Sequence, residues 1–215
     1  MKPYILLNSA MTLDGKIATE NGQLEISGRK DWMRVHKLRC DFDAIMVGIN
    51  TVLIDDPRLT VHKIDTSRKC NPVRIVIDSK ARTPLDARVL NDDADTIIIV
   101  SSLADVNDVE RLSSRAEVIV SGDEEVDLKE AMSILYDKGI KSILQEGGST
   151  LNFAMLEEQL IDRISVCIGP KILGGVSSKT FVGGIGFDKD DCLQLELDDF
   201  YSLDDDIILE YNVKY

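Results

Sequence analysis

Short runs of aliphatic and β-branched residues recur along the chain, and several of them are apolar at nearly every position. Runs such as 74–77 and 96–100 suit strands that are covered on both faces, because neither side of such a strand meets water. Nine runs are predicted to be strands: residues 4–10, 44–48, 73–78, 96–101, 117–120, 141–145, 163–168, 193–197 and 207–213. A chain with this many short apolar strands is expected to fold around a central sheet.

Helical periodicity separates several of these strands, and helices are predicted over residues 28–39, 128–138 and 149–160. Strands that alternate with helices predict a three-layer α/β fold with a mainly parallel central sheet of about nine strands. The last two strands follow each other without a helical pattern, so we expect an antiparallel C-terminal edge. No Pro-rich or Ser-rich linker divides the chain, and we expect a single domain over residues 1–215.

The net charge argues against several classes of partner. Acidic residues outnumber basic ones 38 to 25 in 215 residues, so the chain carries a formal charge of −13 and repels nucleic-acid backbones and anionic membranes. An anionic ligand therefore needs a local cluster of donors. No apolar run is long enough for a signal peptide or a membrane span, so we expect a cytoplasmic protein without nucleic-acid or membrane partners.

The cysteines and histidines offer no metal site. Cys40, Cys70, Cys167 and Cys192 form no C-x-x-C pair, which favours reduced thiols and no bound metal. There are only two histidines, and His36, in a charged predicted helix, is expected to face the solvent. Because the sequence also lacks a G-x-S-x-G elbow, a serine hydrolase is not expected.

A strand of buried character runs into two glycines and then a helix at residues 144–151. Gly147 and Gly148 let the backbone approach a ligand closely, and the amides at the start of the helix, with the Ser149 and Thr150 hydroxyls, suit a phosphate. The spacing is neither G-x-G-x-x-G nor a P-loop. On the residues alone, a nucleotide-binding turn and a plain turn in which Ser149 or Thr150 caps the helix are equally good interpretations.

Two further segments place polar groups after predicted strands. Ser79 and Lys80 lie in a loop that would suit the 2′-phosphate of NADP, although a solvated loop is the commoner explanation of such residues. Thr51 and Asp55 face the same way if residues 50–54 form a short helix, and they would offer a hydroxyl and a carboxylate to a polar ligand. Taken singly, both are more often cap or turn residues.

An ordered set of motifs resembles the riboflavin-pathway reductases. The set comprises L-D-G-K-I-A at 13–18, H-K-L-R at 36–39, I-M-V-G-I-N-T-V at 45–52, D-D-P-R-L-T-V at 55–61, P-V-R-I-V-I-D-S at 72–79 and E-G-G at 146–148. It spans nearly the whole chain in the order of the family. The motifs are most typical of the stand-alone archaeal type, which is related to the reductase half of the bacterial bifunctional deaminase/reductase.

The resemblance implies a dihydrofolate-reductase-like fold, usually in a homodimer. It implies reduction of the ribosyl group of a small pyrimidine nucleotide to a ribityl chain, with NADPH or, in some members, NADH. By position, the residues that look like cofactor or shared-site residues are Ala10, Thr51, Asp55, Ser79, Gly147, Gly148, Ser149 and Thr150. Arg39, Leu59 and Glu146 look like substrate contacts, which favours the nucleotide interpretation of the Gly147-Gly148 turn.

Two positions depart from the family pattern. Leu24 lies in a segment where members commonly have a serine, and His62 stands where many have an arginine. Both positions face the substrate in the family, so His62 is a further candidate substrate residue. We therefore expect the substrate phosphate either to be held less tightly here or to be held by Arg39, Arg58 or Lys37 instead.

The expected reaction is hydride transfer from C4 of the nicotinamide to C1′ of the ribose, in a ring-opened imine form, with Asp55 and Glu146 as catalytic residues. Glu146 would hold the base or the ribosyl hydroxyls, and Asp55 a sugar or phosphate-adjacent hydroxyl. Asp14, Asp55, Glu146 and bound water all stay open as the source of the proton. The alternatives are a dihydrofolate or other pterin reductase on the same fold, and a nucleotide-binding module without turnover.

Overall fold

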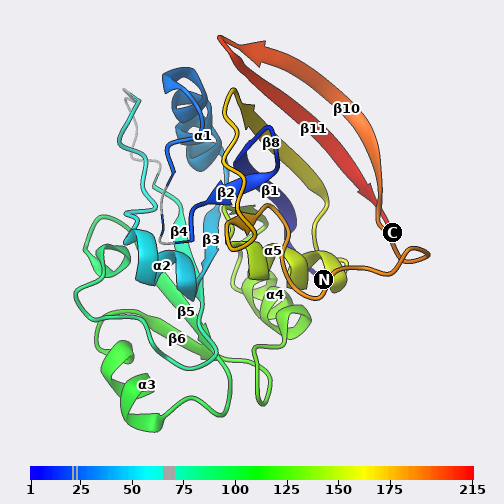
Figure 1. Cartoon of the computed structure of the whole chain (residues 1–215). Helices are drawn as coiled ribbons and strands as arrows, with labels where there is room; N and C mark the ends of the chain where they lie inside the picture. The colour runs from blue at the N-terminus through cyan, green and yellow to red at the C-terminus, as the bar shows by residue number, and fades with distance from the viewer. Residues whose placement is uncertain (21, 23, 65–70) are drawn as a thin grey trace. The chain divides into compact units, whose positions relative to one another are not determined.

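The computed structural model describes residues 1–20, 22, 24–64 and 71–215 (Figure 1). The chain divides into two compact units. Unit 1 comprises Met1–Tyr4 and His36–Leu144, and unit 2 comprises Ile5–Val35 and Gln145–Tyr215. The single domain over residues 1–215 stays a prediction.

Unit 1 is built on parallel strands. In its described part, β3 (Ala44–Gly48), β4 (Val73–Ile77), β5 (Thr96–Val100) and β6 (Glu117–Val120) pair in this order, and each of the three pairs is parallel. Every residue of β5 is buried. A strand between two parallel neighbours is covered by the segments on both faces of its sheet, which explains why β5 is apolar at nearly every position.

The segments between these strands form α2 (Ile49–Asp55), the 3-10 helix η1 (Arg88–Leu90), α3 (Val106–Ser113) and α4 (Leu128–Asp137). Apolar side chains from β3, β4, β5, α2, η1 and α3 pack in one core cluster, which includes Val52 and Leu112. At the start of α4, the Asp127 carboxylate accepts a hydrogen bond of 2.9 Å from the amide of Glu130. This N-cap fixes the point where the chain enters the helix.

Unit 2 holds the antiparallel edge. β1 (Tyr4–Thr12) pairs in parallel with β8 (Arg163–Gly169). β8 pairs antiparallel with β11 (Asp206–Lys214), and β11 pairs antiparallel with β10 (Gln194–Leu203). Figure 1 shows β10 and β11 as a long two-stranded ribbon in orange and red. The remaining elements of this unit are the β2 (Lys16–Ala18) and β9 (Lys179–Thr180) pair and α5 (Ser149–Glu157).

The predicted fold class is confirmed. α1 (Arg29–Asp41) and β7 (Ser142–Gln145) contribute residues to both units, as does β1, whose first residue, Tyr4, belongs to unit 1. Over the described residues, nine strands belong to a mainly parallel sheet with an antiparallel C-terminal edge, as the sequence predicts. α3, β2 and β9 are not predicted, and β10 continues beyond the predicted strand to Leu203.

The cysteines differ from the prediction of four reduced thiols. Cys40 is disulfide-bonded, and Cys70 lies outside the described residues. Cys167 and Cys192 are free, and burial raises the pKa of the Cys167 thiol. Within the described ranges, no helix is both long and apolar enough to cross a bilayer.

Candidate active site

The turn between β7 and α5 lies where the sequence predicts it. Gly147 follows the half-buried Glu146 and has a φ of +95°, which glycine adopts without strain, and its peptide bond to Gly148 is cis. Gly148 is the N-cap of α5, and no described side chain caps this end of the helix. Ser149 and Thr150 are therefore not caps, so the capping role that the plain-turn interpretation gives them is wrong.

The start of α5 has the properties of a phosphate site. The first amides of a helix have no partner inside it and lie at the positive end of its dipole. A Cβ atom built at Gly147 would meet none of the described atoms within 4 Å, so the backbone is open to a ligand on that side. Residues 147–150 therefore fit the phosphates of a dinucleotide.

A second glycine-rich segment packs against the start of α5. The Gly183 amide donates to the Ser149 carbonyl at 3.1 Å, and a Cβ atom at Gly183 would lie 2.6 Å from Ser149 Oγ. At Gly184, a Cβ atom would lie 2.2 Å from the Phe153 ring. Only glycines allow this close approach, so the segment forms a wall beside the turn.

Thr51 and Asp55 lie on α2, which confirms the short helix predicted over residues 50–54. The helix ends at Asp56, whose amide donates to the Val52 carbonyl at 3.0 Å and whose φ of 38° lies in the left-handed region. Thr51 and Asp55 are half-buried and four residues apart, so they share one face. They place a hydroxyl and a carboxylate after the carboxyl end of β3.

The three predicted substrate residues of unit 1, Arg39, Leu59 and His62, lie around Thr60. Arg39 Nη1 donates to the Thr60 carbonyl oxygen at 3.1 Å, and His62 Nδ1 lies 3.1 Å from the same oxygen. Leu59 has a φ of 52°, and its side chain belongs to the buried core cluster. Any contact of Leu59 with a ligand must therefore come from its backbone.

His36 is fully buried behind His62, so the prediction of a solvent-facing ring is wrong. His36 Nδ1 accepts from the His62 amide at 3.1 Å, and the two ring centroids are 4.6 Å apart. Burial and then the charge of Arg39 lower the pKa of His36 to about 3. Burial also lowers the pKa of His62, as do Arg39, Arg58 and Lys63, while the Thr60 carbonyl opposes the shift. The positive charge around Thr60 thus comes from arginine and lysine side chains and not from the two histidines.

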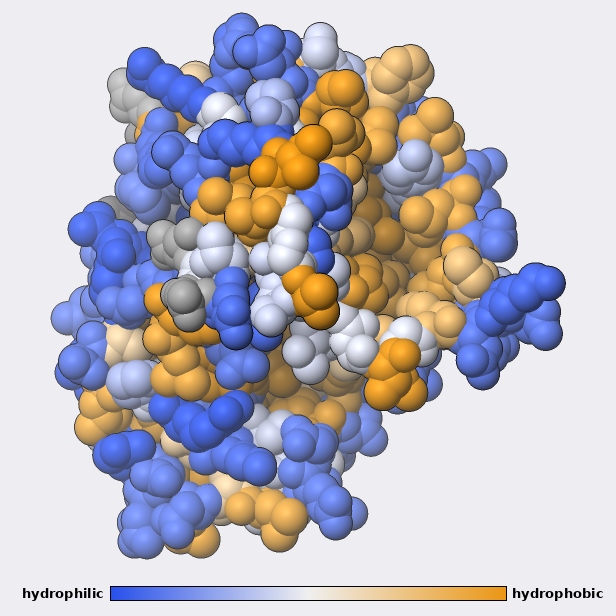
Figure 2. All heavy atoms as spheres, in the orientation of Figure 1, coloured by the Kyte–Doolittle hydropathy of each residue, from blue (hydrophilic) through white to orange (hydrophobic). Residues whose placement is uncertain are grey.

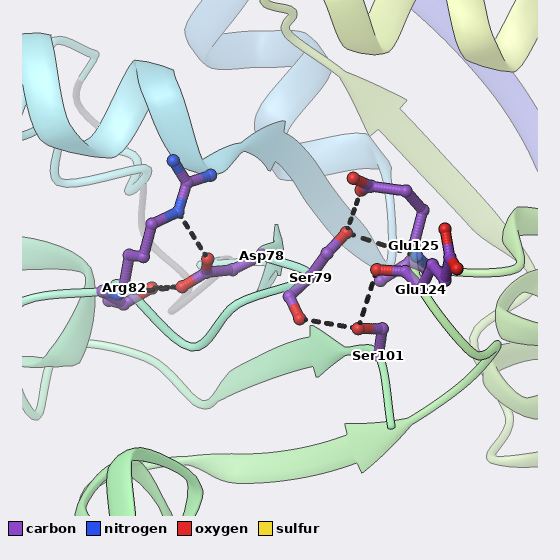
Figure 3. A network of polar contacts seen from close by, with 8 residues as sticks. Asp78, Ser79, Arg82, Ser101, Glu124 and Glu125 are labelled. Atoms are coloured by element: carbon purple, nitrogen blue, oxygen red, sulfur yellow. Dashed lines mark hydrogen bonds and ion pairs between the residues drawn. The ribbon is translucent and has the colours of Figure 1, made fainter. Parts of the chain in front are cut away.

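The loop after β4 begins with a buried carboxylate, which Figure 3 shows. Asp78 Oδ2 accepts from the amide and the hydroxyl of Thr83, both at 2.8 Å. Its other oxygen, Oδ1, pairs with Arg82 Nε at 3.6 Å. Lys80, which lies between Asp78 and Arg82 in the sequence, is exposed. Of the two cations in this loop, Lys80 and Arg82, Arg82 is therefore already paired with Asp78.

The Ser79 hydroxyl is occupied by Glu125, a residue that the sequence does not predict to belong to the site. Ser79 Oγ donates to Glu125 Oε2 at 2.7 Å and accepts from the Val126 amide at 3.2 Å (Figure 3). Glu125 follows β6, and residues after neighbouring parallel strands gather at the same edge of a sheet. The position of Glu125 after a predicted strand is the sequence signal that places it near Ser79.

Asp14 proves to be an anchor of the loop over residues 171–174. Its carboxylate accepts from Thr12 Oγ1 at 2.6 Å and from the amides of Leu173 and Gly174 at 3.0 and 2.6 Å. The Thr12 hydrogen bond, followed by the two amides, lowers the pKa of Asp14 to about 2. A carboxylate held in this way keeps its charge near neutral pH, which argues against Asp14 as the source of a proton.

The predicted site residues divide between the two units. Unit 1 holds Arg39, Thr51, Asp55, Leu59, His62, Ser79 and Lys80. Unit 2 holds Ala10, Glu146, Gly147, Gly148, Ser149 and Thr150. Ala10 is half-buried in β1 and opposes Cys167 of β8, away in sequence from the glycine turn. Among the described residues, no group of three or more His, Cys, Asp or Glu side chains is placed to hold a metal ion.

The chain is similar to known proteins over nearly its whole length. Residues 3–209 match the family model of the RibD C-terminal domain. The chain is 54% identical over 215 residues, 100% of both chains, to the 2,5-diamino-6-ribosylamino-4(3H)-pyrimidinone 5′-phosphate reductase of Methanothermobacter thermautotrophicus. The structure resembles Acinetobacter baumannii RibD with a TM-score of 0.83 and 28% identity, over 99% of this chain and 58% of that one.

A dihydrofolate reductase shares the fold alone. The enzyme from Enterococcus faecalis, complexed with NADP(H) and RAB-propyl, matches with a TM-score of 0.54 and 13% identity over 99% of this chain and 97% of that one. The dihydrofolate-reductase-like fold that the motifs imply is thereby confirmed.

Proposed function

The chain belongs to the RibD C-terminal domain family and is an oxidoreductase of riboflavin biosynthesis, and we propose that it reduces 2,5-diamino-6-ribosylamino-4(3H)-pyrimidinone 5′-phosphate. The product is the corresponding ribitylamino compound. The hydride donor is a reduced nicotinamide dinucleotide, NADPH or NADH. The observation that carries the proposal is the uncapped start of α5 after Gly147 and Gly148, in a chain that is 54% identical to a reductase of this substrate.

The reaction adds a hydride and a proton across one double bond. The bound nicotinamide supplies the hydride from its C4 atom. In the ring-opened imine form of the substrate, a C–H bond forms at C1′ while the π-electron pair of the C=N bond moves to nitrogen. That nitrogen takes a proton, which leaves a ribityl chain on an amine. The protein has to hold the two carbons close together and away from water.

Residues of unit 2 and residues of unit 1 have separate proposed roles. In unit 2, the amides of residues 147–150 bind cofactor phosphates, and Glu146 holds the base or the ribosyl hydroxyls of the substrate. In unit 1, the half-buried Thr51 and Asp55 of α2 bind cofactor or sugar hydroxyls. The proton comes from Asp55, Glu146 or a water that they hold, because the hydrogen bonds to Asp14 keep that residue charged.

The substrate phosphate is assigned to the corner around Thr60. Arg39 is fixed there by its bond to the Thr60 carbonyl oxygen. Burial lowers the pKa of both His36 and His62, and the charge of Arg39 lowers it further. A neutral imidazole carries a single N–H, so a neutral His62 can donate at most one hydrogen bond to a phosphate oxygen. Arg39 and Arg58 therefore supply the charge that binds the phosphate in an otherwise acidic protein.

The test incubates the purified protein with the pyrimidine nucleotide and a reduced nicotinamide that carries deuterium at C4. We expect loss of the reduced-nicotinamide absorbance and a product that contains one deuterium at C1′. A product without the label at C1′ contradicts direct transfer. Turnover of dihydrofolate but not of the pyrimidine nucleotide would identify a pterin reductase, and nicotinamide binding without turnover of either would identify a binding module.

The homodimer is proposed to form through the β10–β11 ribbon of unit 2. Leu195, Leu197 and Phe200 of β10 are exposed, Phe200 by 66%, as is Ile207 of β11. The β11 partners of the three β10 residues are Val213, Tyr211 and Leu209, which are two apart and so share one face. Figure 2 shows apolar surface, in orange, over this region. An apolar face of this kind suits the same face of a second copy.

Mass measurement in solution tests the dimer. We expect the parent protein to have the mass of two chains and the Phe200→Asp variant to have the mass of one, because a buried unpaired carboxylate disfavours association. Leu103→Asp is the control, since Leu103 is an exposed apolar residue of unit 1 outside the ribbon. A dimer that persists in Phe200→Asp places the interface elsewhere.

A further inference from the structure

The peptide group between Thr60 and Val61, in unit 1, is held on both of its edges. Its carbonyl oxygen accepts from Arg39 Nη1 at 3.1 Å, and His62 Nδ1 lies 3.1 Å from the same oxygen. On the other edge, the Val61 amide donates to Asn71 Oδ1 at 2.9 Å. This peptide group is trans and planar, so its N–H and C=O point in opposite directions. The bond to Asn71 therefore also fixes the direction of the Thr60 carbonyl.

The Asn71 side chain uses both ends of its amide group. Its oxygen accepts from the Val61 amide, and its Nδ2 atom donates to the Asp93 carbonyl oxygen at 2.9 Å. A side-chain amide with one partner on its oxygen and another on its nitrogen has its rotation fixed. Asn71 therefore bridges the loop after η1 and the segment that contains Thr60.

The loop that receives Asn71 is tied to a buried arginine of β4. Arg74 is fully buried, and its guanidinium donates to Asn91 Oδ1 at 2.7 Å and to the Asn91 carbonyl oxygen at 2.6 Å. Asn91 Oδ1 also accepts from the Asp93 amide at 3.1 Å, and Asn91 Nδ2 donates to Asp93 Oδ2 at 2.8 Å. The Asp93 carbonyl is therefore a fixed point, from which Asn71 holds the Val61 amide.

We propose that Asn71 is a positioning residue for the substrate, because it fixes the peptide group that orients the Arg39 guanidinium toward the 5′-phosphate. The inference rests on the proposed function, which assigns the phosphate to the corner around Thr60. Arg39 is 6% exposed and bonds the Thr60 carbonyl, so the direction of its guanidinium depends on that carbonyl. A guanidinium binds phosphate oxygens well only when its donors match their geometry. Loss of the Asn71 bond therefore weakens binding of the phosphate and leaves the reacting carbon where it is.

Steady-state kinetics with the pyrimidine nucleotide and with its dephosphorylated riboside test the proposal. Asn71 is exposed, so Asn71→Ala should stay folded. We expect its KM for the nucleotide to rise about three- to tenfold, as for the loss of one hydrogen bond, with kcat unchanged. The riboside has no phosphate, so its kcat/KM should not change. Asn107→Ala, the same truncation at an exposed, hydrogen-bonded asparagine of α3, is the control.

A double-mutant cycle shows whether Asn71 acts through Arg39. The effect of Asn71→Ala on the nucleotide KM should disappear in an Arg39→Gln background, because the guanidinium that Asn71 orients is then gone. An unchanged KM, an equal loss of kcat/KM with nucleotide and riboside, or an undiminished effect in the Arg39→Gln background overturns the role of Asn71. Each of these results leaves the proposed function intact. Failure of the parent protein to reduce the nucleotide overturns both.

Discussion

The side-chain amide of Gln145 donates a hydrogen bond of 2.9 Å to Asn152 Oδ1. Gln145 is the last residue of β7 and Asn152 lies in the first turns of α5, so the bond joins the two ends of the glycine turn. Both side chains are fully buried, and Asn152 Nδ2 donates onward to the Phe181 carbonyl oxygen at 2.8 Å. This chain of bonds fixes the direction in which the first amides of α5 point.

Replacing Asn152 by leucine should destabilise the protein and weaken cofactor binding together. The Gln145 amide and the Phe181 carbonyl would lose their partners in the interior, and we expect the free energy of unfolding to fall by about 3 kcal/mol. Denaturant unfolding and nucleotide titration measure the two effects. Glu157→Gln, an exposed change on the same helix, is the control. A variant with full stability and full affinity would show that the bond does not hold the turn.

The two glycines of the turn should respond differently to substitution. Gly148 has a φ of −78°, which side-chain-bearing residues adopt freely, so Gly148→Val should stay folded and lose cofactor affinity because its branched side chain covers the amides. Gly147 has a φ of +95°, so Gly147→Ala should lower the free energy of unfolding by about 1–2 kcal/mol. Unfolding curves and cofactor titration separate the two cases. Unchanged cofactor affinity in Gly148→Val would show that the cofactor phosphates do not bind at this turn.

The strands were the most predictable part of the fold. β3 and β6 have the predicted bounds because short continuous apolar runs leave little choice of register within a buried sheet. β2 and β9 were missed because strands of three and two residues are too short to show alternation. α3 was missed because it is a short surface helix, and its clearest signal is Asp105, whose side chain accepts from the Asn107 and Asp108 amides.

Single positions in the candidate site depend on tertiary packing that the sequence does not encode locally. His36 was placed on the solvent side because its helical neighbours are charged, yet the segment that contains Thr60 and His62 covers it. Glu125 reaches Ser79 over 46 residues of sequence, through the order of parallel strands. The glycine turn itself was predictable, because its geometry is set by adjacent residues.

The buried His36 ring should make the free energy of unfolding depend on pH. Its pKa falls from 6.5 to about 3 on folding, so between these values the unfolded chain binds a proton that the folded protein does not. The free energy of unfolding should therefore be unaffected by this group above pH 6.5 and decrease as the pH falls below it, by up to about 1.4 kcal/mol per pH unit. Urea unfolding at a series of pH values should give a shallower dependence for His36→Gln. If the free energy of unfolding depended on pH equally in the parent protein and in His36→Gln, the lowered pKa of His36 would be contradicted.

Asp55→Ala and Glu146→Ala should each lower turnover far more than stability. Both side chains are half-buried outside the core, so the free energy of unfolding should change by no more than about 1 kcal/mol, whereas loss of a group that positions substrate or moves a proton costs about 10²- to 10⁴-fold in rate. Steady-state kinetics with either reduced nicotinamide measure the rate, and Glu157→Ala is the control on α5. The conservative variants Asp55→Asn and Glu146→Gln distinguish the roles, because the residue that supplies the proton should lose the corresponding limb of the pH profile. A variant that unfolds at much lower denaturant, with intact specific activity in the folded fraction, would make that residue structural.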